Sequence, residues 1–181
     1  MTKRIFLDTE FKNLPWTGHS DLLWVGLADE DGNSWSAINA DVSIDKSASE
    51  FTRSVVVGRM TPDEPRLDSE ALGRGVREFC GEVVHEFWAW CPTGETLASS
   101  FDLGESAPGM YERYWDWDLQ LLRRVVDPWP PGWPQQLCDL NGLAREVGLV
   151  PPPNASAHHP REDALWDLQV FKLADGLRRR E

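Results

Sequence analysis

The sequence has few cysteines, three in 181 residues, and no pair of them is spaced as in a metal-binding knuckle. Cys80, Cys91 and Cys138 are odd in number and far apart in the chain. This count argues against a disulfide framework and against a structural zinc site. We therefore expect three reduced, partly buried thiols that behave as small apolar side chains.

Long apolar runs are also missing. No stretch approaches the roughly 20 apolar residues that a membrane-spanning helix needs. The first residues, MTKRIFLDTEF, meet acid at residue 8 and lack the apolar stretch of a signal peptide. The expected location is therefore the cytoplasm.

Basic residues are scarce, 18 against 30 acidic ones, which gives a net charge of −12. Proteins that hold nucleic acid tightly neutralise phosphates with Lys and Arg, so this charge argues against a duplex-binding protein. It argues only weakly against a nuclease, because bound metal ions reverse the local sign of the field and short single strands need few phosphate contacts.

What is present is a mixed pattern of strands and helices. Turn chemistry at 30–33 predicts that the first strands form an antiparallel meander. The apolar spacing predicts, in chain order, strands at 4–11, 21–28 and 34–40, a short helix near 49–57, a helix from 68, a strand at 85–92, a helix at 117–126, a short strand within 135–140, and helices at 141–149 and 160–179. The order βββ-α-β-α-β-α indicates one mixed-sheet α/β domain over 1–181, with a loop insertion at about 93–113.

The strongest local signal is Asp8-Thr9-Glu10 at the end of the first strand. Residues two apart on a strand point to the same face, so the carboxylates of Asp8 and Glu10 would lie about 6 to 7 Å apart. Two buried like charges without a basic partner are destabilising, and a divalent cation is the simplest compensation. The alternative is that the strand ends at Leu7 and both acids are solvated.

A second signal precedes the last helix, where His158 stands five residues before Asp163 and Pro160 begins the helix. Asp163 would then lie in the first helical turn, and a histidine on the preceding loop could take a proton from water. An acid that merely complements the helix dipole, beside exposed histidines, is the plainer interpretation.

A third acid stands between these two. Asp118 begins the run Asp-Leu-Gln-Leu-Leu-Arg-Arg-Val-Val and would sit at a helix N-terminus. Asp116 is its rival, and Asp102 is a weaker candidate because Gly104 and Pro108 interrupt the helix that should follow it.

Together, residues 6–11 (FLDTEF), residues 117–122 (WDLQLL) and His158-x4-Asp163 resemble the three motifs of the DEDDh 3′–5′ exonucleases. That group includes ribonuclease T, oligoribonuclease and bacterial proofreading subunits, and the stretch 87–90 (FWAW) is similar to one in small bacterial 3′–5′ exoribonucleases. The resemblance spans residues 5 to 170 and keeps the motifs in order. It implies a ribonuclease-H-like fold with a five-stranded mixed sheet, an antiparallel meander of three strands plus two parallel ones, flanked by helices.

The same resemblance implies a site and a reaction. Two divalent ions, Mg²⁺ or Mn²⁺, would be held by four acids, and His158 would be the general base in the hydrolysis of single-stranded RNA or DNA from its 3′ end, which releases nucleoside 5′-monophosphates. Thr9 and Phe11 are the expected substrate contacts. The four expected metal ligands are Asp8, Glu10, Asp118 and Asp163.

The chain departs from the family in two places. Residues 91–113 separate the strand expected at 85–92 from Asp118, where the family has a short link. His159-Pro160 is atypical after the family histidine, so His159 remains an alternative base. The preference for RNA or DNA is not specified, and a homodimer is left open. A ribonuclease H- or resolvase-like endonuclease and an inactive interaction domain are the alternative functions.

Ten tryptophans raise the question of base stacking. Most fall in expected strands or helices and are assigned to the core: Trp24, Trp88, Trp90 and Trp166. Trp129 and Trp133, in the Pro-rich stretch 127–134, are the better candidates for exposure and for substrate contact.

Overall fold

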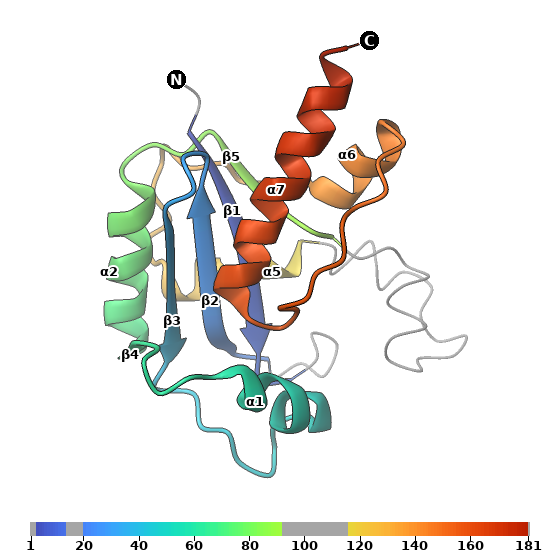
Figure 1. The fold of residues 1–181 in the computed structure, drawn as a ribbon. Helices are drawn as coiled ribbons and strands as arrows, with labels where there is room; N and C mark the ends of the chain where they lie inside the picture. Colours follow the sequence, from blue (N-terminus) through green and yellow to red (C-terminus); the bar gives the residue numbers. More distant parts are fainter. Residues whose placement is uncertain (1–2, 14–19, 92–115, 181) are drawn as a thin grey trace, which may run out of the picture.

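The computed structural model describes residues 3–13, 20–91 and 116–180 of the chain. Its centre is a sheet of mixed direction (Figure 1). Strands β1 (Arg4–Phe11), β2 (Leu22–Asp29) and β3 (Ser34–Asn39) form the expected antiparallel meander. On the other side of β1, β5 (Glu86–Ala89) and β6 (Leu137–Asp139) run parallel to it. The mixed α/β fold expected from the sequence is confirmed.

The sheet has a sixth strand that the sequence does not predict. β4 (Arg66–Leu67) pairs in parallel with the end of β3, so the order is β4-β3-β2-β1-β5-β6 rather than that of a five-stranded sheet. Two residues are too short for any alternation of apolar and polar side chains. Only the pairing of the backbone defines this strand.

The turn between β2 and β3 shows why the meander forms. The side chain of Asp29 accepts hydrogen bonds from the backbone N–H of Asp31, 3.0 Å, and of Asn33, 2.9 Å. Gly32 adopts a φ of +88°, a conformation that favours glycine. The turn residues therefore close the hairpin with local bonds.

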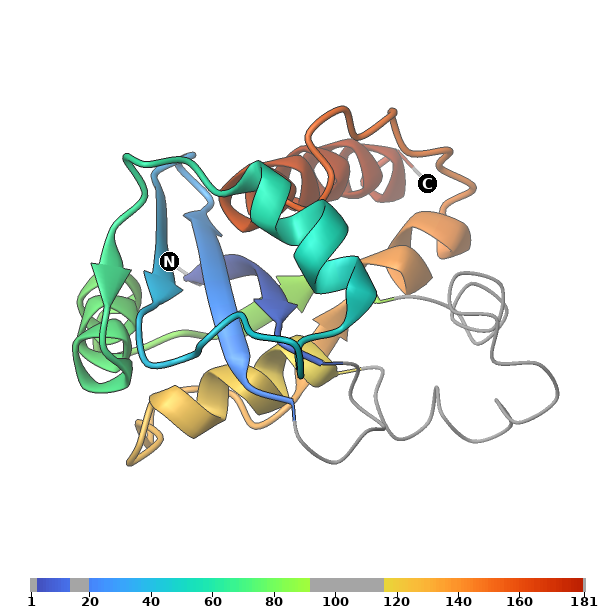
Figure 2. The same cartoon turned by 90° about the horizontal axis from the view of Figure 1, so that it is seen from below.

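Helices cover both faces of the sheet (Figures 1 and 2). α7 (Pro160–Arg178) crosses one face over β1 and β2, and α6 (Leu140–Glu146) packs beside it. α2 (Ser69–Cys80) and α5 (Trp117–Val125) lie on the other face, where Ile5 and Leu7 of β1 enter the main core. The alternation of β1 sends Phe6 toward α7 instead, and its ring lies 5.3 Å from that of Phe171.

Two helical pieces follow β3. η2 (Thr52–Val56), a π-helical turn, continues directly into α1 (Val57–Arg59), close to the helix expected near 49–57. α2 begins as its sequence predicts, because the side chain of Asp68 accepts a hydrogen bond from the backbone N–H of Ala71 at 2.7 Å. None of the helices in the described ranges is long and apolar enough to cross a membrane. The expected loop at 93–113 lies outside the described residues.

The tryptophans follow the expectation only in part. Trp24 is fully buried, and Trp88, Trp90 and Trp166 are partly buried against the cluster between α6 and α7. The expected exposure of Trp133 is wrong, because it is 3% exposed and its indole N–H donates to the carbonyl of Gly81 at 2.9 Å. Its partner Trp129 is partly buried beside it at 5.1 Å, since the Pro-rich segment folds back onto the core.

Candidate metal centre

The end of β1 and the beginning of α7 bring three carboxylates together. Asp8 and Glu10 project from the same face of β1, as the period of two predicts, and Asp163 lies in the first turn of α7. Each of the three acids offers an oxygen, and these oxygens all lie within 4.8 Å of one another. Residues more than 150 positions apart in the chain thus meet at one place.

The approach of α7 to the sheet depends on one glycine. Gly26 of β2 stands opposite Asp8 in the register of the two strands. A Cβ atom at Gly26 would lie 2.0 Å from the carbonyl carbon of Pro160, which is a backbone atom and not the end of a flexible side chain. The absence of a side chain here lets the N-terminus of α7 rest on β2, close enough for Asp163 to reach Asp8.

The three acids gather negative charge at a place where the imidazole of His158 contacts Glu10. Glu10 is 6% exposed, and Oδ2 of Asp8 is buried without a hydrogen-bond partner. Within the described ranges, no Lys or Arg forms an ion pair with Asp8, Glu10 or Asp163. Burial raises the pKa of Asp8 well above its ordinary value, and the charges of neighbouring carboxylates raise it further. A cluster of this kind is suited to a bound divalent cation.

Glu10 and Asp163 are perturbed in the same direction by burial. The pKa of Glu10 is raised mainly by burial, against the opposing hydrogen bond to His158. The pKa of Asp163 is also raised by burial, although Asn154 donates to its Oδ1 at 2.5 Å and the backbone N–H of His158 donates to its Oδ2 at 2.8 Å. Both carboxylates are therefore oriented by contacts with His158 or Asn154, and burial still raises the pKa of each.

Asp118 stands beside this group, at the N-terminus of α5. Its Oδ1 accepts hydrogen bonds from the backbone N–H of Thr9 at 3.0 Å and from the Thr9 hydroxyl at 2.5 Å. Burial raises its pKa to about 6, against these two bonds. Asp118 is not one of the three residues whose oxygens lie within 4.8 Å of one another. It is joined to them through Thr9, which lies between Asp8 and Glu10 on β1.

The rival Asp116 is placed differently. It is the residue before α5, and its Oδ1 accepts a hydrogen bond from the side chain of Gln120 at 2.5 Å. The contact of Asp116 is thus with its own helix, whereas Asp118 accepts hydrogen bonds from Thr9 of β1. Of the two acids, the geometry associates Asp118 with the site. The third rival, Asp102, lies outside the described residues.

His158 lies on the loop before α7, with its ring toward the acids. Nδ1 is 3.3 Å from Oε1 of Glu10, and the side chain is 43% exposed, so solvent reaches the ring. The contact with Glu10 raises the pKa of His158. Its backbone has a φ of +71°, which is uncommon for a residue with a side chain. A ring held by a carboxylate and open to water on its other side can accept a proton.

His159 faces away from this group. Its ring centroid is 4.6 Å from that of Trp24, and its Nε2 is 3.6 Å from Oε1 of Glu64. The two histidines therefore contact different acids, and it is His158 that contacts Glu10.

The two expected substrate contacts differ in their surroundings. Thr9 is 4% exposed and its hydroxyl is engaged by Asp118. Phe11 is partly buried against the main core, at the end of β1. Phe11 is thus packed against the core and not fully covered, whereas Thr9 is suited to orienting Asp118.

Asp167 is a further acid near the site that the sequence reasoning missed. It is 2% exposed, one helical turn after Asp163, and its Oδ2 accepts a hydrogen bond from the backbone N–H of Trp90 at 3.1 Å. Burial raises its pKa well above the ordinary value. The spacing of four from Asp163 on the same helix would have indicated it. Asn154 was also missed, and its Pro-rich surroundings carry no local signal.

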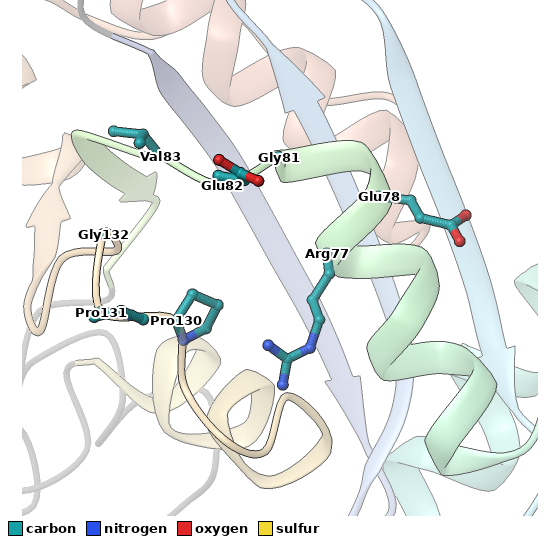
Figure 3. Close-up of a pocket in the computed structure, with 8 residues that line it drawn as sticks. All are labelled: Arg77, Glu78, Gly81, Glu82, Val83, Pro130, Pro131 and Gly132. Atoms are coloured by element: carbon teal, nitrogen blue, oxygen red, sulfur yellow. The ribbon is translucent and has the colours of Figure 1, made fainter.

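A cavity of about 610 Å³ lies elsewhere, between the C-terminal end of α2 and the Pro-rich segment (Figure 3). Its lining includes Arg77, Val83 and Pro130, and none of the acids or histidines described above. The cavity is therefore separate from the carboxylate cluster.

Comparison with known proteins gives a likeness in fold but none in sequence. No family model matches the sequence, and no curated protein matches it. The fold resembles that of exonuclease I. The solved structure of that enzyme, described as suggesting how processivity is achieved, superposes with a TM-score of 0.50 at 16% identity. The likeness covers 99% of this chain and 42% of exonuclease I, so the chain spans less than half of that protein. At this identity, the likeness shows a shared exonuclease-like fold.

Proposed function

We propose that this protein is a two-metal-ion 3′–5′ exonuclease of the DEDDh type, which hydrolyses single-stranded RNA or DNA to nucleoside 5′-monophosphates. The observation that carries the proposal is the convergence of Asp8, Glu10 and Asp163, with no Lys or Arg paired to them in the described residues and His158 in contact with Glu10. The fold that the chain shares with exonuclease I supports the proposal. The order of the three sequence motifs supports it as well.

The chemistry of the donor set fits Mg²⁺ or Mn²⁺, because it is made of carboxylate oxygens and contains no thiol or imidazole ligand. In this proposal Asp8, Glu10 and Asp163 hold the ions together with Asp118, which Thr9 orients. When bound there, divalent ions would stabilise charge on the phosphoryl group and would lower the pKa of water.

The protein's own residues then have distinct tasks. His158 accepts a proton from the attacking water through Nε2, since its Nδ1 faces Glu10. Glu10 orients that ring and stabilises the imidazolium once it is formed. Phe11, at the end of β1, would pack against the terminal base, and aromatic–base stacking of this kind contributes roughly 1–3 kcal/mol.

The test uses single-stranded RNA and DNA of the same sequence, labelled at the 5′ end, with Mg²⁺ or Mn²⁺ and an EDTA control. We expect a ladder that shortens one nucleotide at a time, requires metal, and disappears in Asp163→Asn. The matched control is Asp175→Asn, an acid three turns later in α7 that pairs with Arg179 at 2.7 Å. Discrete internal cuts would instead indicate an endonuclease. No cleavage by the folded protein with either metal would contradict the proposal and favour an inactive interaction domain.

A further inference from the structure

A further buried acid contacts the residues that follow the candidate base. The side chain of Glu64, on the loop before β4, is only 3% exposed. One of its oxygens, Oε2, accepts a hydrogen bond from the hydroxyl of Ser36 in β3 at 2.6 Å. The other, Oε1, lies 3.6 Å from Nε2 of His159 and 3.8 Å from Nη1 of Arg161. Glu64 therefore connects the sheet to both residues that flank Pro160.

These contacts attach the start of α7 to the sheet. A buried carboxylate is stable only when its oxygens have polar partners, and here the partners come from β3 and from the start of α7. His159 is in addition held against the ring of Trp24 in β2. Pro160 rests on Gly26 with no space for a side chain between them. The segment 159–161 is thus fixed to the sheet from several directions.

The residue just before this segment is strained. His158 has a φ of +71°, and left-handed backbone is unfavourable at a residue other than glycine. Such a conformation persists only where its surroundings hold it. Around His158, the ring meets that of Phe51 at 4.8 Å and Oε1 of Glu10 at 3.3 Å. Phe51 directly precedes η2, and Figure 2 shows η2 and α1 beside the loop that enters α7.

We propose that Glu64 is a positioning residue for the reaction, which acts through His159 and Arg161 to hold His158 in its left-handed conformation against Glu10. This inference rests on the proposed function, because it assumes that His158 is the base. It also gives His159 a role other than that of a base. The sequence offers no sign of it, since Glu64 lies 95 positions before His159 in an irregular stretch.

A structural experiment tests the positioning independently of activity. Crystal structures of the metal-free wild type, Glu64→Gln and Glu64→Ala would be compared, with Asp63→Asn, an exposed neighbour, as the charge-matched control. Glu64→Gln keeps the volume and the bond from Ser36, so it folds even if Glu64→Ala does not. We expect His158 to leave its positive φ and its contact with Glu10 in the Glu64 variants only. If both features persist in Glu64→Gln and Glu64→Ala, the proposal is overturned.

A kinetic experiment tests the consequence for the reaction. Single-turnover rates on the labelled strand would be measured for Glu64→Gln, His158→Ala and the double variant. We expect Glu64→Gln to lower the rate about 10- to 100-fold, as for other residues that orient a metal-site group, with little change in KM. It should cause no further loss in the His158→Ala background, and the thermal shift on adding Mn²⁺ should be kept.

Losses that multiply in the double variant would show that Glu64 supports the fold in general, which would overturn the proposal. Failure of the wild type to cleave either strand would contradict the proposed function. The crystal structures would still decide whether Glu64 positions His158.

Discussion

The two ends of strand β1 both gather acids, but they treat the charge in opposite ways. At its beginning, the guanidinium of Arg4 lies between two carboxylates, 2.8 Å from Glu30 and 2.7 Å from Glu86. At its end, Asp8 and Glu10 meet Asp163 without a Lys or Arg partner among the described residues. Only four positions along β1 separate Arg4, which pairs with two acids, from Asp8, whose cluster has no Lys or Arg partner among the described residues.

The difference teaches what kind of partner each cluster needs. The acids around Arg4 are satisfied within the chain, so that end of the strand needs nothing from outside. The acids around Asp8 are buried more deeply and repel one another, and burial raises the pKa of each. An arrangement that costs stability in isolation is typical of a functional site rather than of a structural one.

The largest expected effect is on activity, from Asp8→Asn. In the proposed function Asp8 holds a metal ion, and losing such a ligand would forfeit several kcal/mol of transition-state stabilisation, a loss of about 10³-fold at 1.36 kcal/mol per factor of ten. The same change should raise the melting temperature of the metal-free protein, because it removes a repelling charge. Single-turnover rates and thermal unfolding in EDTA would measure the two effects.

The matched change at the other end of β1 is Glu30→Gln, which should leave the rate unchanged. Equal losses of rate from Asp8→Asn and Glu30→Gln would mean that the two clusters do not differ in function.

The next effect is stabilisation by the metal ion. Divalent cations should bind the native cluster and not the unfolded chain, so Mn²⁺ at 100 times its Kd should stabilise the protein by about 2.7 kcal/mol. The increase should vanish in Asp163→Asn and remain in Glu30→Gln. Urea unfolding with and without Mn²⁺ measures it. An increase of the same size in both variants would place the ion elsewhere.

A smaller effect concerns pH in the absence of metal. The pKa of Asp118 is raised to about 6 from an ordinary 3.8, so between these values the native protein binds more protons than the unfolded chain. Stability should therefore fall as pH rises from about 4 to about 6. The raised pKa of His158 acts in the same direction, because stability is lost as pH rises through its native value.

Urea unfolding in EDTA at pH 4, 5, 6 and 7 measures this dependence. Saturating Mn²⁺ should reverse the trend, because metal binding requires deprotonated ligands. A metal-free stability that rises with pH over this interval would contradict the raised pKa values.

The sequence predicted those parts of the fold and site that have a local pattern. The period of two placed Asp8 and Glu10 on one face of β1, and the proline at the first helical position placed Asp163 in the first turn of α7. The apolar spacing after Asp118 located α5. Whether these acids are metal ligands stays a prediction, although the structure brings three of them within reach of one ion.

What the sequence could not predict depends on tertiary contacts. The two-residue β4 exists only through its pairing with β3. Trp133 is buried because a Pro-rich segment folds back over Phe87, and composition alone had suggested exposure. Glu64 carries no local signal, since its partners come from β3 and from the start of α7. Contacts of this kind follow from the fold rather than from spacing along the chain.

The smallest expected effect comes from Arg4→Met, at the satisfied end of β1. Arg4 and its two acids are each about a third exposed, so solvent screens the pairs and the loss should be only about 1 kcal/mol. For a chain of this size, this corresponds to a fall of roughly 2–4 °C in the melting temperature. The rate and the stabilisation by Mn²⁺ should not change, because the acids released by the substitution can turn toward water. A loss of activity in Arg4→Met would instead couple the two ends of the strand, and the contrast between them would then be one of charge but not of function.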